Sequence, residues 1–231
     1  MQVDTMKRRW VWMGIAVAVL LGVQGAYAQA LRSPELNVQY HRAETAWRSG
    51  TSMLEAKARV DRVLKALPDD REARKLRAQV LMALGRHEEA LDDAIRAVEL
   101  DPKDGEAHVI LCEAARLTGN LPQAEKALDD ASHHLRDQVD LHIRLSWNAV
   151  ELEQLDKAEA FARIALNLDS LDAGAYYQLA RVFMLQGVPD NAATILARGF
   201  RASLLDAAII RQDPPLQPLL EHPDLQAWLA K

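Results

Sequence analysis

The sequence has a single cysteine, Cys112, among its 231 residues. One cysteine permits no disulfide bond within the chain. A bacterial lipoprotein leader would need a cysteine at its cleavage site, and Cys112 lies far from the N-terminus, so lipid anchoring by that route is excluded.

The sequence also lacks an excess of positive charge. It contains 28 lysine and arginine residues against 33 aspartate and glutamate residues, a formal net charge of −5. If residues 1–28 are removed, 25 basic and 32 acidic residues remain, which gives −7. A protein that binds the phosphate backbone of a nucleic acid needs a clustered basic face. The composition therefore predicts no nucleic-acid partner.

Motifs of common enzyme classes are absent as well. The sequence has no HExxH motif, no glycine-rich phosphate loop, no haem-attachment motif and no nucleophile signature. The nearest group of potential metal ligands contains five residues: His133, His134, Asp137, Asp140 and His142. His133 and His134 are expected at the end of a helix, where the helix dipole favours positive charge. The sequence therefore predicts no enzyme, no metal and no cofactor, and a metal-dependent hydrolase using His133, His134 and His142 is the weakest alternative.

The N-terminal segment has the features of a secretory signal peptide. Lys7, Arg8 and Arg9 precede an uncharged run from Trp10 to Val23, and Ala26-Tyr27-Ala28 offers a cleavage site. The run has 14 residues, about 21 Å as a helix, whereas a bilayer core is roughly 30 Å thick. We expect residues 1–28 to be removed and the protein to be periplasmic. The alternative is an uncleaved inner-membrane anchor at residues 10–28, with the remainder facing the periplasm.

A period of 34 residues dominates the rest of the chain. Alanine recurs at this spacing without insertion or deletion, at Ala56, Ala90, Ala124, Ala158 and Ala192. Counting from repeat starts at residues 37, 71, 105, 139 and 173, the eighth place is also small in four repeats, at Ala78, Cys112, Ser146 and Ala180. Small residues at two fixed depths predict a pair of antiparallel helices that approach closely. Cys112 is thus expected to be a buried structural thiol.

The second repeat, residues 71–104, closely resembles the tetratricopeptide repeat. The matching features are Leu84-Gly85 in the turn, Ala90, Ala97, and Asp101-Pro102 at the end. This resemblance implies an all-α, right-handed solenoid of five helix-turn-helix repeats, at residues 37–70, 71–104, 105–138, 139–172 and 173–204. The sequence departs from the family at the fourth place, where the expected aromatic residue is replaced in three repeats, by Arg74, His108 and His142.

The segments before and after the array are predicted to differ in structure. Residues 29–36 are predicted to form a flexible lead-in. Residues 205–231 contain two helix-start signals, Asp213-Pro214-Pro215 and His222-Pro223-Asp224, each followed by leucines. This stretch resembles the closing module of bacterial arrays of the same family, and it predicts a short helical C-terminal cap.

The resemblance also implies where a partner binds, because the first helix of each repeat lines a concave groove in this family. The residues carried over to this groove are Lys75, Gln79, Met82, Glu113, Arg116, Arg144, Trp147, Tyr177 and Arg181. Trp147 either anchors a ligand side chain or packs against a neighbouring repeat. Arg116, Arg144 and Arg181 either grip carboxylates or are simply solvated. The family's carboxylate clamp is not predicted, because Gln79, Ile110 and Asp140 stand where clamp residues would be.

These observations predict a non-enzymatic protein–protein interaction scaffold of the bacterial cell envelope. Its partner would be a peptide or helical segment of an envelope protein involved in assembly, secretion or polysaccharide export, and it would meet the membrane only indirectly or through an uncleaved N-terminal segment. The alternative is an accessory structural subunit of an obligate envelope complex, with an idle groove.

Overall fold

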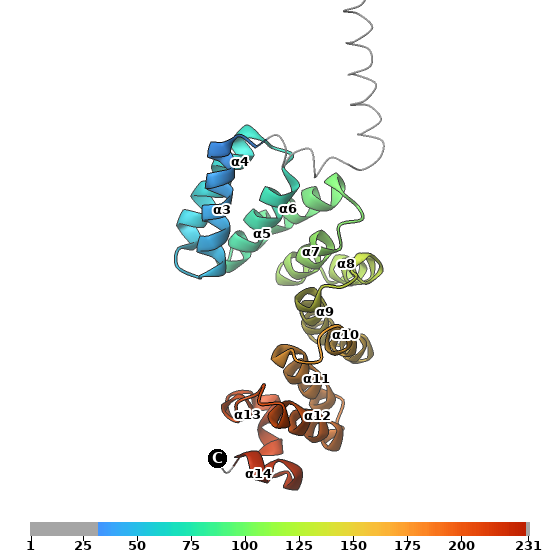
Figure 1. The fold of residues 1–231 in the computed structure, drawn as a ribbon. Helices are drawn as coiled ribbons and strands as arrows, with labels where there is room; N and C mark the ends of the chain where they lie inside the picture. The colour runs from blue at the N-terminus through green and yellow to red at the C-terminus, as the bar shows by residue number, and fades with distance from the viewer. Residues whose placement is uncertain (1–31, 230–231) are drawn as a thin grey trace, which may run out of the picture. The chain divides into compact units, whose positions relative to one another are not determined.

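The structure of the chain is a computed structural model that describes residues 32–229. The predicted signal peptide and the first residues of the lead-in lie outside this range. Within it, the secondary structure is entirely helical, and consecutive helices form pairs (Figure 1). The paired helices are α3 (Pro34–Arg48) with α4 (Met53–Ala66), α5 (Arg71–Ala83) with α6 (His87–Leu100), α7 (Gly105–Leu117) with α8 (Leu121–His134), α9 (Val139–Glu151) with α10 (Leu155–Leu168), and α11 (Ala173–Leu185) with α12 (Pro189–Arg201). The all-α, helix-turn-helix fold class is confirmed.

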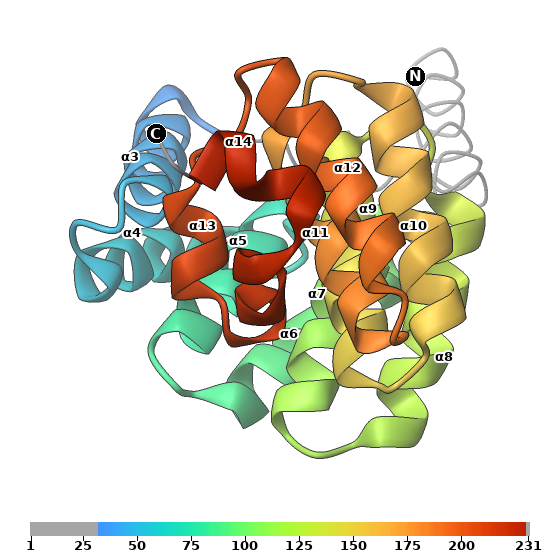
Figure 2. The ribbon, with the colours of Figure 1, turned by 90° about the horizontal axis from the view of Figure 1, so that it is seen from below.

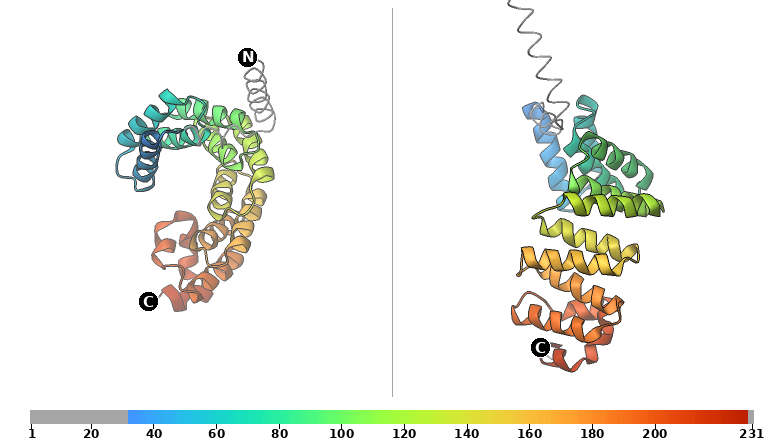
Figure 3. Two further views of the ribbon diagram at one scale, coloured as in Figure 1. Left: turned by 45° about the horizontal axis from the view of Figure 1, so that its top comes forward. Right: turned by 90° about the vertical axis from the view of Figure 1, so that its right-hand side faces the viewer.

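The chain divides into two compact units, whose described parts are residues 32–127 and 128–229. In the first unit, α3 packs on α4, α4 on α5, α5 on α6 and α6 on α7. In the second unit, α9 packs on α10, α10 on α11 and α11 on α12. Figures 2 and 3 show this stacking in sequence order within each unit. These helices therefore pack against their neighbours in the sequence, as in a repeat protein.

The first helices of the last four repeats begin at the predicted repeat starts, residues 71, 105, 139 and 173. The first repeat differs, because α3 begins at Pro34 and not at residue 37. Ser33 caps this helix by accepting a hydrogen bond from the Leu36 amide at 3.3 Å, and Pro34 takes the first helical position, where a missing N–H costs nothing. The predicted lead-in of residues 29–36 is therefore shorter, since its last three residues form the first turn of α3.

An aspartate at the last place of a repeat caps the helix that follows. Asp70, Asp104 and Asp172, spaced by the repeat length or twice that length, accept a hydrogen bond from the amide three residues ahead at 3.0, 3.1 and 2.7 Å, respectively. Gln138 occupies the same place before α9, and its side chain makes no capping bond. Helix α9 thus lacks the side-chain N-cap that α5, α7 and α11 have.

We expect Gln138→Asn to stabilise the protein by about 0.5–1 kcal/mol, because asparagine is a strong N-cap residue in the extended backbone conformation that Gln138 adopts. Asparagine also avoids adding a carboxylate beside Asp137 and Asp140. Urea unfolding of the two proteins measures the difference. The control is Asp172→Asn, which keeps a capping side chain and is expected to change stability little. A Gln138→Asn protein no more stable than the parent would contradict the capping argument.

The recurring small residues all lie in the interior. Ala56, Ala90, Ala124, Ala158 and Ala192 are fully buried. The eighth-place residues are buried too, and burial raises the pKa of the Cys112 thiol to about 12, as expected of a structural cysteine. The Ser146 hydroxyl donates to the Ala158 carbonyl at 2.7 Å, and this bond joins α9 to α10. Small residues at these depths thus allow the helices of a pair to touch.

The second repeat replaces part of its apolar interior with ion pairs. Arg74, at the fourth place, donates to Asp93 at 2.6 Å, and Arg77 donates to both carboxylate oxygens of Asp93 at 2.5 and 2.7 Å. Asp93 is buried, so these bonds compensate the loss of its hydration. The arginine that departs from the family pattern at residue 74 therefore has a structural partner on α6.

The C-terminal segment closes the second unit. It contains α13 (Ala208–Gln212), two 3₁₀ helices η1 (Pro214–Glu221) and η2 (Pro223–Leu225), and α14 (Gln226–Leu229). Both 3₁₀ helices begin at the prolines of the two predicted start signals. Four side chains of the segment are at most 1% exposed and join the core of α11 and α12: Ile210, Leu216, Leu219 and Leu225. The Trp228 ring stacks on Phe200 of α12 at 6.2 Å between ring centres.

Gly199 on α12 marks where this segment turns back. Other repeats have alanine or valine at this place, the twenty-seventh. A Cβ at Gly199 would lie 2.5 Å from Cδ1 of Leu205 and 3.3 Å from Cγ of Tyr176. A larger residue at this place would therefore force the Leu205 side chain to shift.

Candidate functional site

The nine predicted groove residues lie on the first helices of four repeats. Lys75, Gln79 and Met82 lie on α5, Glu113 and Arg116 on α7, Arg144 and Trp147 on α9, and Tyr177 and Arg181 on α11. The first five belong to the first unit and the last four to the second. The two sets are therefore described separately.

In the first unit, Lys75 is engaged in ion pairs within the chain. Its Nζ lies 2.6 Å from Glu106, 3.0 Å from Asp104 and 3.1 Å from Glu72. Burial by itself would lower the pKa of Lys75, but the three carboxylates outweigh it and raise the pKa. The side chain is 7% exposed. Lys75 thus links α5 to the start of α7, and a ligand would have to compete with three carboxylates for its ammonium group.

The other residues of this set differ in exposure. Gln79 is buried, whereas Met82, Glu113 and Arg116 are half-buried. Met82 supplies a flexible apolar side chain that adapts to different surfaces. In the first unit, the half-buried residues are therefore more accessible to a partner than Lys75 and Gln79.

In the second unit, the structure brings three of the four predicted residues together, with a fourth residue that sequence reasoning did not assign to the groove. The guanidinium of Arg181 lies over the Trp147 ring, 4.1 Å from its centre, and the rings of Trp147 and Tyr177 are 6.1 Å apart. The Tyr177 hydroxyl donates to Oδ2 of Asp213 at 3.0 Å. We call Trp147, Tyr177, Arg181 and Asp213 the aromatic–arginine cluster.

The polar groups of the cluster are not fully paired with one another. Burial, together with the hydrogen bond and negative charge of Asp213, raises the pKa of Tyr177 to about 12. Asp213 Oδ2 also lies 3.7 Å from Nε of Arg181, an ion-pair distance too long for a hydrogen bond. Nε and Nη1 of Arg181 are shielded from solvent, and neither has a hydrogen-bond partner among the described residues. The cluster therefore contains buried donors that a carboxylate could use more fully.

Of the two interpretations of Trp147, the structure supports packing against a neighbouring repeat, since Tyr177 and Arg181 both belong to the next repeat. Trp147 nevertheless remains half-buried. In the sequence pattern, Asp213 is only part of a helix-start signal. Asp213 does precede η1, but its side chain makes no capping bond to that helix. No sequence pattern could reveal that the carboxylate turns to α11.

The histidines of the weakest alternative do not converge. His142 is buried on α9, and its Nδ1 lies 2.9 Å from the Gln138 carbonyl. His133 and His134 are exposed at the end of α8. Between residues 32 and 229, no three histidine, cysteine, aspartate or glutamate side chains are grouped so that they could hold a metal ion. The structure thus gives the hydrolase alternative no metal-binding group within this range.

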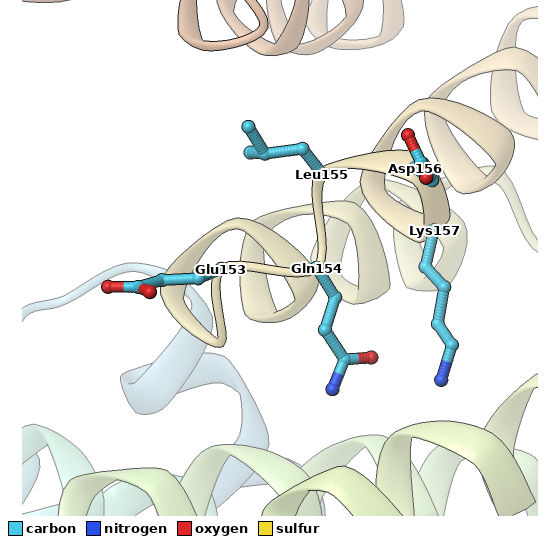
Figure 4. A pocket seen from close by; sticks show the side chains of 5 residues that line it. All are labelled: Glu153, Gln154, Leu155, Asp156 and Lys157. Atoms are coloured by element: carbon cyan, nitrogen blue, oxygen red, sulfur yellow. The ribbon is translucent and has the colours of Figure 1, made fainter.

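A surface pocket of about 470 Å³ lies at the turn between α9 and α10. It is lined by Glu153, Gln154, Leu155, Asp156 and Lys157. Figure 4 shows that these side chains point in different directions rather than toward a common point. Lys157 is paired with Asp129 at 2.5 Å. The pocket therefore offers no converging set of groups for a ligand.

None of the helices within residues 32–229 has the length and apolar character needed to cross a bilayer.

Comparisons with known proteins agree with the helical repeats. Two sequence profiles described as tetratricopeptide repeat match residues 53–104 and 81–145. No curated protein sequence matches the chain. Among solved structures, TTC0263, a thermophilic TPR protein from Thermus thermophilus, is 24% identical over 79% of this chain and 99% of its own, with a TM-score of 0.64.

Two further solved structures share the fold at lower identity. PilW, described as a widely conserved type IV pilus biogenesis factor, is 16% identical over 85% of this chain and 99% of its own, with a TM-score of 0.65. YrrB, described as a TPR protein with an unusual peptide-binding site, is 18% identical over 72% of this chain and 91% of its own, with a TM-score of 0.53. At these identities the likeness shows a common fold.

Proposed function

Because the chain belongs to the tetratricopeptide repeat family, we propose that it is a non-enzymatic scaffold that binds a peptide or helical segment of a partner protein along the first helices of its repeats. The proposed surface includes Met82, Glu113 and Arg116 in the first unit, and Arg144 with the aromatic–arginine cluster in the second. Proteins of this fold include one described by its peptide-binding site, YrrB.

The observation that carries this proposal is the aromatic–arginine cluster. A half-buried tryptophan, a tyrosine and an arginine from two successive first helices are the residue types that concentrate binding energy in protein interfaces. Arg181 in addition keeps shielded N–H donors without hydrogen-bond partners among the described residues, and such donors favour an acceptor supplied by a ligand.

We place the protein in the bacterial cell envelope as part of the same proposal. The support is the signal-peptide pattern of residues 1–28 and the shared fold of PilW, a type IV pilus biogenesis factor. The partner would then be an envelope protein engaged in assembly, secretion or polysaccharide export.

Charge reversal at Arg144 tests the binding surface. We expect Arg144→Glu to abolish capture of the partner that crosslinks to the unchanged protein in cells. The introduced glutamate would repel an acidic partner segment at the proposed surface. The matched control is Arg198→Glu, the same charge reversal at an exposed residue on the second helix α12. Melting temperatures of both variants show whether the fold is intact.

The alternative function is an accessory structural subunit that uses its other face. Ile164 and Leu168, one turn apart on α10, and Leu171 just beyond it are 40%, 39% and 66% exposed. Such exposed apolar side chains on a second helix are compatible with an interface there. Capture that is unaffected by Arg144→Glu but lost on Ile164→Glu would favour this alternative and contradict the first.

A further inference from the structure

Asp213 contacts the predicted groove of its own chain. It lies between α13 and η1, and its carboxylate accepts the hydrogen bond of Tyr177 and approaches Arg181. An aspartate before a helix usually bonds to the helix amides, and Asp213 makes no such bond to η1. Its side chain is only 14% exposed. The carboxylate is thus directed at α11 instead of its own helix.

Asp213 satisfies this site incompletely. A guanidinium and a carboxylate pair best through two parallel N–H···O bonds of about 2.7–2.9 Å. Asp213 is 3.7 Å from Nε of Arg181, and Nε and Nη1 have no hydrogen-bond partner in the described part of the chain. A carboxylate that approached Arg181 side-on would gain hydrogen bonds that Asp213 does not make.

Only the side chain of Asp213 holds it to α11, whereas its backbone belongs to the cap: the Leu216 amide donates to the Asp213 carbonyl at 2.9 Å. Ile210 and Leu216, on either side of it, are fully buried and anchor the two ends. Between them, Arg211, Gln212 and Pro214 are exposed. Turning the Asp213 side chain away from α11 therefore breaks one hydrogen bond and one long ion pair, and it leaves the backbone bond to Leu216 and the apolar core of the cap in place.

We propose that Asp213 is an internal ligand that covers a carboxylate-binding site formed by Trp147, Tyr177 and Arg181, and that an acidic side chain of a partner segment displaces it. This proposal rests on the function proposed above and names the chemistry of the partner. The residues around Asp213 indicate what kind of partner peptide could replace it. Asp213 is followed by Pro214-Pro215-Leu216, so the expected peptide has an acidic residue followed by a stiff apolar stretch. The rings of Trp147 and Tyr177 are suited to contact such a stretch.

The test uses a peptide probe and the full chain. The probe is the acetylated and amidated peptide RQDPPL, the sequence of residues 211–216, together with a version that has asparagine in place of aspartate. Blocking both ends leaves the aspartate as the only carboxylate. Binding is followed by the NMR signal of the Trp147 indole N–H, which is identified by its loss in Trp147→Phe.

We expect Asp213→Ala to bind the aspartate peptide about tenfold more tightly than the unchanged protein, because the competing carboxylate is removed. Glu221→Ala, which removes an exposed carboxylate of the same cap, should bind like the unchanged protein. The asparagine peptide should bind Asp213→Ala about tenfold more weakly than the aspartate peptide. Arg181→Ala added to Asp213→Ala should remove this preference.

Equal binding to the unchanged protein and Asp213→Ala, or equal binding of the two peptides, would overturn the internal-ligand proposal. If Asp213→Ala unfolds without cooperativity, Asp213→Asn takes its place, since it removes the charge and keeps the shape; the same gain in affinity is expected. A negative result here together with loss of partner capture in Arg144→Glu would refute the internal ligand and leave the proposed function standing. Unchanged capture in Arg144→Glu would count against the function itself.

Discussion

Replacement of Asp70 by alanine is expected to lower the free energy of unfolding of the first unit by about 3–5 kcal/mol. Asp70 receives two hydrogen bonds from Arg32, at 2.5 and 2.6 Å, and both side chains are at most 1% exposed. It also caps α5 through the Ala73 amide. The substitution leaves the Arg32 guanidinium buried without its carboxylate, and a buried unpaired charge is among the most costly defects in a protein interior.

The array supplies a matched control for this substitution. Asp172 caps α11 through the Ala175 amide, as Asp70 caps α5, but no ion pair of Asp172 is found among the described residues. Asp172→Ala should therefore cost only the cap, about 1 kcal/mol. Urea unfolding followed by circular dichroism, with hydrogen exchange of residues 34–83, measures both effects. Equal losses in the two variants would contradict the role assigned to Arg32.

Removal of residues 205–231 is the second change with a large expected effect. The cap covers buried apolar side chains of the last repeat, including Tyr176, Leu196 and Phe200. Without the cap these side chains would be exposed, and an exposed apolar face of this kind promotes association. We expect the shortened protein to melt at a lower temperature and to form oligomers or aggregates in size-exclusion chromatography.

A single substitution separates the packing role of the cap from the effect of shortening the chain. Leu216→Ala removes a fully buried side chain of the cap and should cost about 2–5 kcal/mol. The control Leu171→Ala changes a side chain that is 66% exposed and should cost less than about 0.5 kcal/mol. A shortened protein that stays monomeric and melts unchanged would show that the segment does not close the repeat.

The periodic part of the fold could be predicted from the sequence because each repeat has residues of the same kind at the same places. Small residues at fixed places, such as Ala90 and Ala158, are needed wherever two helices touch, and they recur in the sequence as they do in the structure. Helix α3 begins three residues before the first repeat as counted in the sequence. Ser33 and Pro34 form a good helix start, but they precede the first repeat and so lie outside the periodic pattern.

The aromatic–arginine cluster could be predicted from the sequence only in part. Trp147, Tyr177 and Arg181 were assigned to the groove through their places in the repeat, and they do lie together. Asp213 was not, since it belongs to the non-repeating cap and its position depends on how that segment folds back. The ion pairs of Lys75 were also missed, because Glu106 is 31 residues away and no local pattern links the two.

The most direct test of the account is site-specific photo-crosslinking in cells, with the photoreactive residue at Met82 or Arg144 on first helices, or at Leu54 or Ile164 on second helices. All four positions are half-buried or exposed, so each can accept the probe. We expect Met82 and Arg144 to crosslink one and the same partner protein, and Leu54 and Ile164 not to crosslink it. A partner protein that crosslinks only from Leu54 or Ile164, and from neither Met82 nor Arg144, would contradict the binding function assigned to the first helices.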